Sequence, residues 1–467
     1  MSNLLKSAAA LLFAGAMLLA GVIAASANTR RVWDLTLPSF HEAFADYFYI
    51  GNIMEPSHLT TDNTAMFTHH YNIVTPENMM KPSSMAPRPG TYNLTASNGF
   101  MTWAESNNLK VHGHTLVWHS QSAGWLTGSV DNPLTREEAR ANMQDYINAV
   151  AGEYSGRIYS WDVVNEAFTT SVNALVLDWR DALRKFDGGN EASAWYAAYS
   201  NGATGDEDGS DYIYDAFVFA RLADPHAILF YNDFNETQGG KREAIVMMTN
   251  ELNQKWANDP QNTDPDRLLI EGLGMQAHYW TADLSPLSVE MTIAEFVQTG
   301  AVVGITELDL PLGRYGNFGQ PTEENFARQA QLYRELFEVF MKYSDNIDRV
   351  TFWGKADPQS WRAQGFPLIF DLNFEAKPAY YSIMSLIYPE MAPEYATSEV
   401  SESDTEDGEV SDTPDTASIG DAADPFNAAE NTAASDEGLP WWVTGLLGCG
   451  AVAIVAVIIF VVAKKKA

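Results

Sequence analysis

The sequence predicts an α/β protein: a single (β/α)8 TIM barrel, followed by a disordered acidic linker and one C-terminal transmembrane helix. Between about residue 33 and residue 391, eight strand-like runs alternate with amphipathic stretches of helical period, the pattern of such a barrel. A segment without lysine or arginine follows, and then a long run without any charge. A doubly wound sheet is the alternative, but the glycine-rich nucleotide-binding loops typical of it are missing from the sequence.

The expected strands are rich in β-branched and aromatic residues. They are Tyr47–Met54, Tyr71–Pro76, Leu109–Val117, Ile158–Asn165, Ala227–Asn232, Leu268–Gln276, Ala301–Leu308 and Arg349–Trp353. The expected helices are Thr135–Glu153, Tyr212–Leu222, Lys241–Trp256, Val289–Thr299, Glu323–Tyr343 and Ala379–Leu386. Thr135, with Glu138 three residues later, has the form of a capping box, which predicts where the first of these helices begins.

Polar and aromatic residues gather where seven of these strands end, and in a barrel the active site lies at those ends. They are Glu77, Asn78, Lys81, His112, His114, Trp118, His119, Asn165, Glu166, Asn232, Asp233, Gln276, His278, Glu307, Asp309 and Trp353. Any one of these residues could have a purely structural role, but polar or aromatic residues at seven strand ends together predict an active site. Glu166 and Glu307 are its expected centre, because two carboxyl groups facing each other across a barrel mouth suit glycosidic bond cleavage.

Composition limits the partners of the chain. The formal net charge is −33, from 61 acidic residues against 28 Lys and Arg, so no nucleic acid is expected to bind, because its phosphates would be repelled. A neutral polysaccharide suits this charge. Cys449 is the one cysteine, which excludes an intramolecular disulfide. We expect a monomer without a metal or a cofactor.

Five tryptophans are candidates for stacking on sugar rings: Trp103, Trp118, Trp125, Trp353 and Trp361. For Trp103 and Trp125, packing in the core is an equally good interpretation. The acidic, glycine-rich stretch Asn201–Ser210 is interpreted as a flexible loop rather than a cation site.

Both ends of the chain carry hydrophobic segments. Residues 1–27 have the features of a secretory signal: Lys6, an apolar run and the small-residue site Ala25-Ser26-Ala27; an uncleaved anchor is the alternative. Residues 441–463 are 23 residues without a charge, long enough to span a bilayer as a helix. The basic tail 464–467 is expected in the cytoplasm, and its lysines argue against a GPI signal, whose tail ends apolar.

Residues 393–440 are predicted to be a disordered linker. They hold 14 acidic residues and no Lys or Arg, and such a segment buries too little apolar surface to fold. The expected domain 28–392 is therefore tethered by a solvated spacer to the extracellular face of the cell membrane.

Seven motifs, in order along the chain, carry a resemblance to a known family. They are TPENMMK (Thr75–Lys81), GHTLVWHSQ (Gly113–Gln121), WDVVNEAF (Trp161–Phe168), YNDFN (Tyr231–Asn235), GMQAHY (Gly274–Tyr279), TELDL (Thr306–Leu310) and FWGKADPQSW (Phe352–Trp361), and Phe370–Tyr380 closes the domain. From about Phe40 to Ile387 the chain resembles the glycoside hydrolase family 10 endo-β-1,4-xylanases.

The resemblance implies hydrolysis of internal xylan bonds with retention, with Glu166 as acid/base and Glu307 as nucleophile. It implies that His278 orients the nucleophile and that Asp309 stands behind His278. The substrate-binding residues that it implies are Glu77, Asn78, Lys81, His114, Trp118, Asn165, Gln276, Trp353 and Trp361. Asn232 and Asp233 are interpreted as structural support of the rim. A β-1,4-glucan or an aryl glycoside as substrate, and a non-catalytic polysaccharide-binding surface protein, are the alternatives.

The chain departs from the family at three places that do not touch the two carboxyl groups. Pro82 stands where a tryptophan is usual, His112 where an arginine is usual, and Ser122–Gly124 lacks the usual proline. We expect Pro82 to reshape the loop after the second strand. We expect His112 to alter the charge beneath the cleft.

Overall fold

The structure, a computed structural model, describes residues 33–172 and 175–393. The expected leader 1–27, the linker beyond residue 393, the span 441–463 and the tail 464–467 lie outside the described residues. Within 33–172 and 175–393, no helix is both long enough and apolar enough to cross a membrane. The described part corresponds to the predicted barrel domain.

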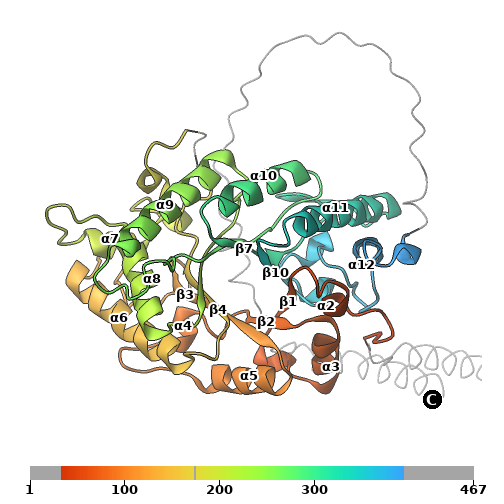
Figure 1. The fold of residues 1–467 in the computed structure, drawn as a ribbon, viewed down its shortest axis with the longest axis horizontal. Helices are drawn as coiled ribbons and strands as arrows, with labels where there is room; N and C mark the ends of the chain where they lie inside the picture. The colour runs from red at the N-terminus through yellow and green to blue at the C-terminus, as the bar shows by residue number, and fades with distance from the viewer. Residues whose placement is uncertain (1–32, 173–174, 394–467) are drawn as a thin grey trace, which may run out of the picture. The chain divides into compact units, whose positions relative to one another are not determined.

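Eight parallel strands close into a barrel, in the order β1-β2-β3-β4-β5-β6-β7-β10 and back to β1 (Figure 1). They are β1 Tyr49–Met54, β2 Ile73–Pro76, β3 Lys110–Trp118, β4 Ser160–Asn165, β5 Ile228–Asp233, β6 Gly272–Met275, β7 Val302–Leu308 and β10 Ile347–Phe352. Each overlaps its predicted range, so the predicted (β/α)8 barrel is confirmed.

Strand β6 begins at Gly272 rather than at the predicted Leu268. Leu269 and Ile270 are buried, as their apolar side chains require. However, their N–H groups donate to Asn253 Oδ1, at 3.1 and 2.8 Å, and not to a neighbouring strand. A side chain of the preceding helix thus takes the place of the first ladder bonds.

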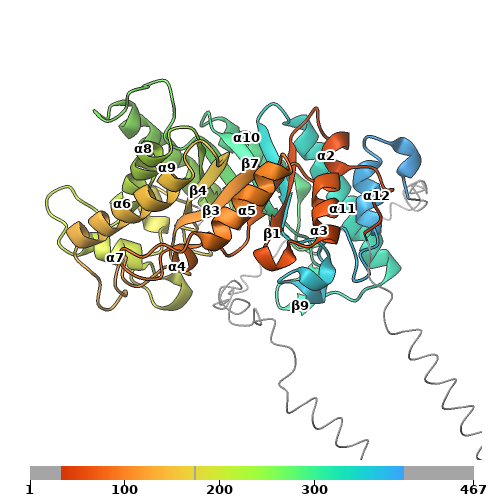
Figure 2. The same ribbon diagram turned by 90° about the horizontal axis from the view of Figure 1, so that it is seen from below.

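Helices surround the strands (Figures 1 and 2). They are α2 Phe40–Ala43, α3 Thr61–His70, α4 Pro82–Met85, α5 Thr95–Ser106, α6 Arg136–Glu153, α7 Ala194–Ser200, α8 Asp211–Ala223, α9 Gly239–Ala257, α10 Pro286–Val297, α11 Glu323–Lys342 and α12 Pro378–Met384. All the predicted helices are present. The predicted capping box is confirmed, because Thr135 Oγ1 accepts from Glu138 N and Glu138 Oε2 accepts from Thr135 N.

Some short elements were not predicted. Helices α3 and α5 are among them, as is a hairpin of two short strands, β8 Gly313–Arg314 and β9 Asn317–Phe318, in the loop after β7.

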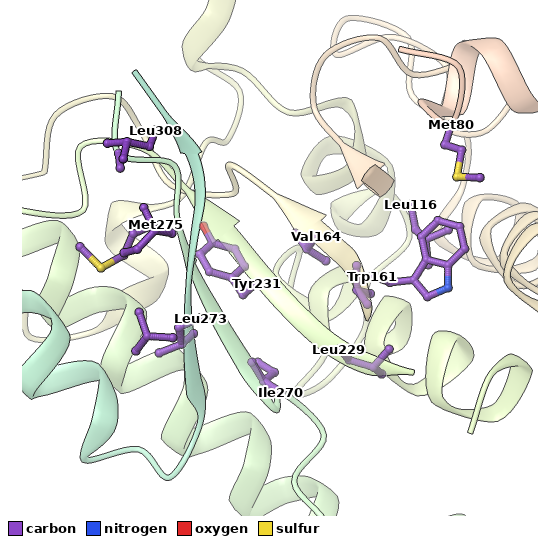
Figure 3. Packing of buried hydrophobic residues seen from close by; sticks show 14 of the residues in the cluster. Met80, Leu116, Trp161, Val164, Leu229, Tyr231, Ile270, Leu273, Met275 and Leu308 are labelled. Atoms are coloured by element: carbon purple, nitrogen blue, oxygen red, sulfur yellow. The ribbon is translucent and has the colours of Figure 1, made fainter. Parts of the chain in front are cut away.

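The core between strands and helices is apolar, and Figure 3 shows part of it. Trp161 of β4 is fully buried and lies 6.5 Å from the ring of Tyr154, which ends α6. Because side chains alternate along a strand, the next residue, Asp162, points into the barrel, where it contacts His114. Alternate side chains of β4 therefore pack against the helices, and those between them place polar groups inside the barrel.

Gly113 of β3 lies against Trp161 and leaves no room for a side chain. An alanine Cβ there would lie 2.2 Å from a ring carbon of Trp161. We expect Gly113→Ala to lower the free energy of unfolding by about 1–3 kcal/mol, because the indole must shift in a packed core. The midpoint of thermal unfolding, followed by circular dichroism, measures this change.

Gly99→Ala is the matched control, because nothing lies within 4 Å of an added Cβ at this exposed position of α5. It is expected to stabilise the protein by about 0.5–1 kcal/mol, since alanine is the better helix former. Equal effects of the two substitutions would contradict the close contact of Gly113 with Trp161.

Candidate active site

Glu166 and Glu307 lie at the carboxyl ends of two barrel strands. Glu307 belongs to β7, and Glu166 follows Asn165, the last residue of β4. Their exposed fractions are 1% and 4%. Glu166 has a left-handed backbone with φ of 55°, which costs of order 1–3 kcal/mol in a residue other than glycine. This turn keeps its carboxyl group beside the Asn165 amide.

One chain of hydrogen bonds joins the two carboxyl groups. Asn232 Nδ2 donates to Glu307 Oε1 at 2.8 Å and to Asn165 Oδ1 at 2.9 Å. Asn165 Nδ2 donates to Glu166 Oε1 at 3.1 Å, and Gln276 Nε2 donates to the same oxygen at 2.8 Å. Glu166 and Glu307 are therefore positioned by the same set of buried amides.

His278 links the carboxyl groups of Glu307 and Asp309. Its Nε2 is 3.2 Å from Glu307 Oε2, and its Nδ1 is 2.9 Å from Asp309 Oδ1. Burial opposes the charged imidazole, but Asp309 and Glu307 outweigh it and raise the pKa of His278 to about 9. An imidazolium at neutral pH thus donates to Glu307.

Asp309 is held in turn from the loop after β10. Arg362 Nη1 donates to Asp309 Oδ1 at 2.5 Å, and Trp361 Nε1 donates to Asp309 Oδ2 at 3.0 Å. Burial alone would raise the pKa of Asp309, but Arg362 and His278 lower it. Asp309 therefore stays ionised behind His278.

Three further residues contact this site: Trp118 and His114 of β3, and Trp353, which follows β10. Trp118 Nε1 donates to Glu166 Oε2 at 2.9 Å. The His114 ring lies 5.5 Å from the Trp353 ring, and the Trp353 ring lies 6.3 Å from that of His278. His114 Nδ1 is fixed at 2.9 Å from Asp162 Oδ2.

Four charged side chains form a cluster beside Trp118: Glu55, Glu77, Lys81 and Lys355. Lys81 Nζ lies 5.0 Å from the Trp118 ring centroid. Burial raises the pKa of Glu77, although Lys81 and Lys355 oppose this. Burial and the charge of Glu77 raise the pKa of Glu55 to about 7, and burial lowers the pKa of Lys355 to about 8.

The loop after β2 is held in place from two sides. Glu55 Oε1 accepts a hydrogen bond from Asn78 N, next to Glu77. Pro82 takes the first position of α4, where proline is well tolerated. The following residue, Ser83, donates from its N–H to Gln121 O at 2.8 Å. Pro82, which stands where the family usually has a tryptophan, thus begins the short helix α4, and α4 is hydrogen-bonded to the loop after β3.

The departure at His112 is accompanied by a buried arginine. Arg349 Nη2 of β10 lies 2.9 Å from His112 Nε2, which is also 3.0 Å from Asp162 Oδ2. Both Arg349 and His112 are buried. Burial and the positive charge of Arg349 lower the pKa of His112. The positive charge beneath the cleft is therefore carried by Arg349 of β10 rather than by a residue of β3.

Apart from Trp103, Trp125, His119 and Asp233, the predicted site residues lie in these connected groups. The His119 ring lies 5.8 Å from that of Trp118, and Asp233 pairs with Lys241 at 2.7 Å. Trp103 Nε1 donates to Thr64 Oγ1 at 3.1 Å and Trp125 Nε1 donates to Ala86 O at 2.8 Å, and both rings pack on the core. In the loop 201–210, Glu207 pairs with Arg136 at 3.3 Å. Among residues 33–172 and 175–393, no three His, Cys, Asp or Glu are grouped to hold a metal ion.

The sequence analysis missed several residues of the site. Asn232 was assigned only to the rim, yet it contacts Glu307 directly. Glu55 follows the first strand immediately, so the rule that polar residues end barrel strands would have found it there too. Lys355 and Arg362 lie in the loop beyond the last strand and carried no signal except their charge.

Residues 39–386 match the model of the glycosyl hydrolase family 10. The chain belongs to glycosyl hydrolase family 10. A β-1,4-xylanase of Dictyoglomus thermophilum is 34% identical to this family 10 protein over 362 residues, which cover 75% of this chain and 91% of that protein. The matched range contains every site residue described above.

Solved xylanases have the same fold. A family 10 xylanase from termite gut, which contains a bacterial Ig-like domain, is 34% identical, with a TM-score of 0.67 over 78% of this chain and 80% of that one. The intracellular xylanase of Thermoanaerobacterium saccharolyticum, solved as a mutant in complex with xylotetraose, is 29% identical. Its TM-score is 0.63 over 75% of this chain and 100% of that one.

The charge of His278 is open to direct measurement. We expect Asp309→Asn to lower the pKa of His278 from about 9 toward its ordinary value of 6.5, because a carboxylate in contact is lost. Since the folded-state pKa is the higher one, the charged imidazole stabilises the wild type below about pH 6.5. That stabilisation is lost as the pH rises through 9.

An NMR titration of the His278 ε1 proton, assigned with His278→Gln, measures both pKa values. A wild-type pKa near 6.5 would contradict the ion pairs of His278 with Glu307 and Asp309.

Proposed function

We propose that this family 10 protein is an endo-1,4-β-xylanase that hydrolyses internal xylan bonds by a retaining double displacement. The observation that carries the proposal is the single hydrogen-bond chain from Glu307 through Asn232 and Asn165 to Glu166. It holds two carboxyl groups of different strands at one site, and retaining glycosidases need such a pair about 5–5.5 Å apart.

The surroundings of the two carboxyl groups support different roles for them. Glu307 contacts the imidazolium of His278, and the nucleophile of a retaining glycosidase attacks as a carboxylate. The donors described for Glu166 are the neutral amides of Asn165 and Gln276 and the Trp118 indole. Glu166 is thus the group better suited to carry a proton and give it up.

The reaction then has two steps. In the first, Glu307 attacks the anomeric carbon, the bond to the leaving oxygen breaks, and Glu166 protonates that oxygen. In the second, Glu166 takes a proton from water, whose oxygen displaces Glu307 from the sugar. We assign to Asn165 a hydrogen bond to the sugar hydroxyl beside the reacting carbon.

The remaining residues form the proposed sugar-binding surface. Glu77, Asn78 and Lys81 offer charged and polar groups to the hydroxyls of a sugar on the non-reducing side. Trp353 and Trp361 offer ring faces for stacking, as sugar-binding sites commonly do. The xylotetraose complex of the Thermoanaerobacterium relative supports xylan as the substrate.

The central test compares Glu166→Gln and Glu307→Gln in residues 28–392. On xylan, we expect Glu307→Gln to lower kcat by roughly 10⁴-fold or more and Glu166→Gln by roughly 10²–10⁴-fold. Release of reducing sugar measures both, and NMR of the first products should show the β-anomer. Glu105→Gln, at an exposed ion pair with Arg157, is the control.

Xylotetraose binding by the two inactive variants, measured by calorimetry, shows that they are folded. Carboxymethyl cellulose is assayed alongside xylan. Hydrolysis of the glucan alone would keep the mechanism and replace the substrate, whereas binding without hydrolysis by the wild type would favour a surface lectin.

We further propose that the domain is secreted and held at the outer face of the cell membrane. The signal-like residues 1–27, the uncharged run 441–463 and the lysines 464–466 support this arrangement. The acidic linker 393–440 would keep the domain away from the membrane surface.

Removing residues 441–467 tests the anchor. Xylanase activity of the full chain should sediment with membranes and be accessible to added xylan on intact cells, while the shortened chain should release it to the medium. Finding the full chain, with its C-terminus intact, mainly in the medium would contradict the tether.

A further inference from the structure

Glu166 leaves strand β4 in a left-handed backbone conformation, with φ of 55°. Side chains other than glycine rarely adopt this conformation, so its surroundings must hold it. On one side, Asn232 O accepts the Glu166 N–H at 2.9 Å. On the other side, the carbonyl oxygen of Glu166 accepts from Arg184 Nε at 3.1 Å. The direction of the carboxyl group therefore depends on both contacts.

Arg184 is completely buried, which is unusual for a charged side chain. Besides Glu166 O, its guanidinium donates to Asn190 O, and its Nη1 lies 3.3 Å from Glu191 Oε2. Glu191 Oε2 also accepts from Thr170 N at 3.0 Å. One arginine thus joins Glu166 to two separate parts of the loop after β4.

The backbone around Arg184 is attached to the same place. Arg184 N donates to Ala167 O at 2.9 Å, and Thr169 N donates to Ala182 O at 2.9 Å. Ala167 N, which belongs to the peptide after Glu166, donates to Tyr231 Oη at 3.1 Å. The peptide that follows Glu166 is therefore held at its carbonyl by Arg184 and at its N–H by Tyr231.

We propose that Arg184 is a positioning residue for Glu166, which locks the left-handed turn and so aims the carboxyl group at the leaving oxygen. This inference rests on the acid/base role proposed for Glu166. Because Arg184 is completely buried, a bound sugar would not contact it, and its effect should appear only in the proton transfers that Glu166 performs.

Those proton transfers can be bypassed chemically. A 2,4-dinitrophenolate leaves the anomeric carbon with the bonding electrons and needs no proton, whereas phenolate is a poor leaving group that does. In the second step, azide attacks the sugar bound to Glu307 and releases the carboxylate without giving up a proton, unlike water. A misplaced Glu166 should therefore slow only the reactions that need its proton.

The experiment compares Arg184→Met and Arg184→Lys with the wild type, using the full chain in detergent. On phenyl β-xylobioside, kcat/KM is expected to fall roughly 10–100-fold, since a displacement of about 1 Å costs this much. On the 2,4-dinitrophenyl substrate, kcat/KM should stay within about threefold, because the positioning acts through proton transfer alone. Where kcat falls on that substrate, added azide should restore it.

Arg180→Met is the matched control. Arg180 lies in the same loop and pairs with Glu251 and Asp178, but its side chain is 32% exposed. It should leave the ratio of the two kcat/KM values unchanged. Arg184→Lys keeps the buried positive charge but lacks the guanidinium fork that reaches Glu166 O and Asn190 O together, so the same selective loss is expected. If Arg184→Met does not fold, Arg184→Lys alone tests the positioning role of Arg184.

Equal losses on both aryl substrates, or wild-type values on both, would overturn the positioning role. Failure of the proposed function has a different signature, because the wild type itself would then hydrolyse neither substrate.

Discussion

The side chain of Asn232 bridges the two strands that carry the proposed catalytic carboxyl groups, and the geometry of the site depends on it. Asn232 lies on β5, yet it bonds to Asn165 on β4 and to Glu307 on β7. To reach β7 it must pass over β6, where Gly274 leaves the space: a Cβ there would lie 2.3 Å from Asn232 Oδ1. Thr306 Oγ1 then donates to Asn232 Oδ1 at 2.7 Å and fixes the orientation of the amide.

Much of this arrangement was predictable because it repeats a simple pattern. Eight buried strands, seven of them with polar or aromatic residues at their ends, identify a barrel and its mouth, and the Glu166–Glu307 pair follows. Helices α3 and α5 were not predicted because both contain several residues of low helix propensity, threonine and asparagine among them, and α5 has no side-chain N-cap. The contact of Asn232 across β6 was not predicted either. It depends on Gly274, a residue without a side chain that lies far from Asn232 in the sequence.

Glu307 and Glu166 are the same residue type, but the side chains around them differ. Glu307 belongs to a line of alternating charges that continues through His278 and Asp309 to Arg362. Glu166 contacts amides and an indole, and its backbone is held in place by a buried arginine. The proposed nucleophile and the proposed acid/base are the same residue type, and they differ in the groups that the barrel places beside each of them.

The pairing of His112 with Arg349 beneath the cleft has a consequence for how such barrels diverge. The two residues are 237 positions apart, yet the guanidinium of one lies against the imidazole of the other. An unpaired charge buried in a packed barrel is costly, so a cation lost from one strand is expected to be replaced from another. We expect that related barrels with a histidine at the position of His112 also have an arginine at the position of Arg349, so that the two residues change together.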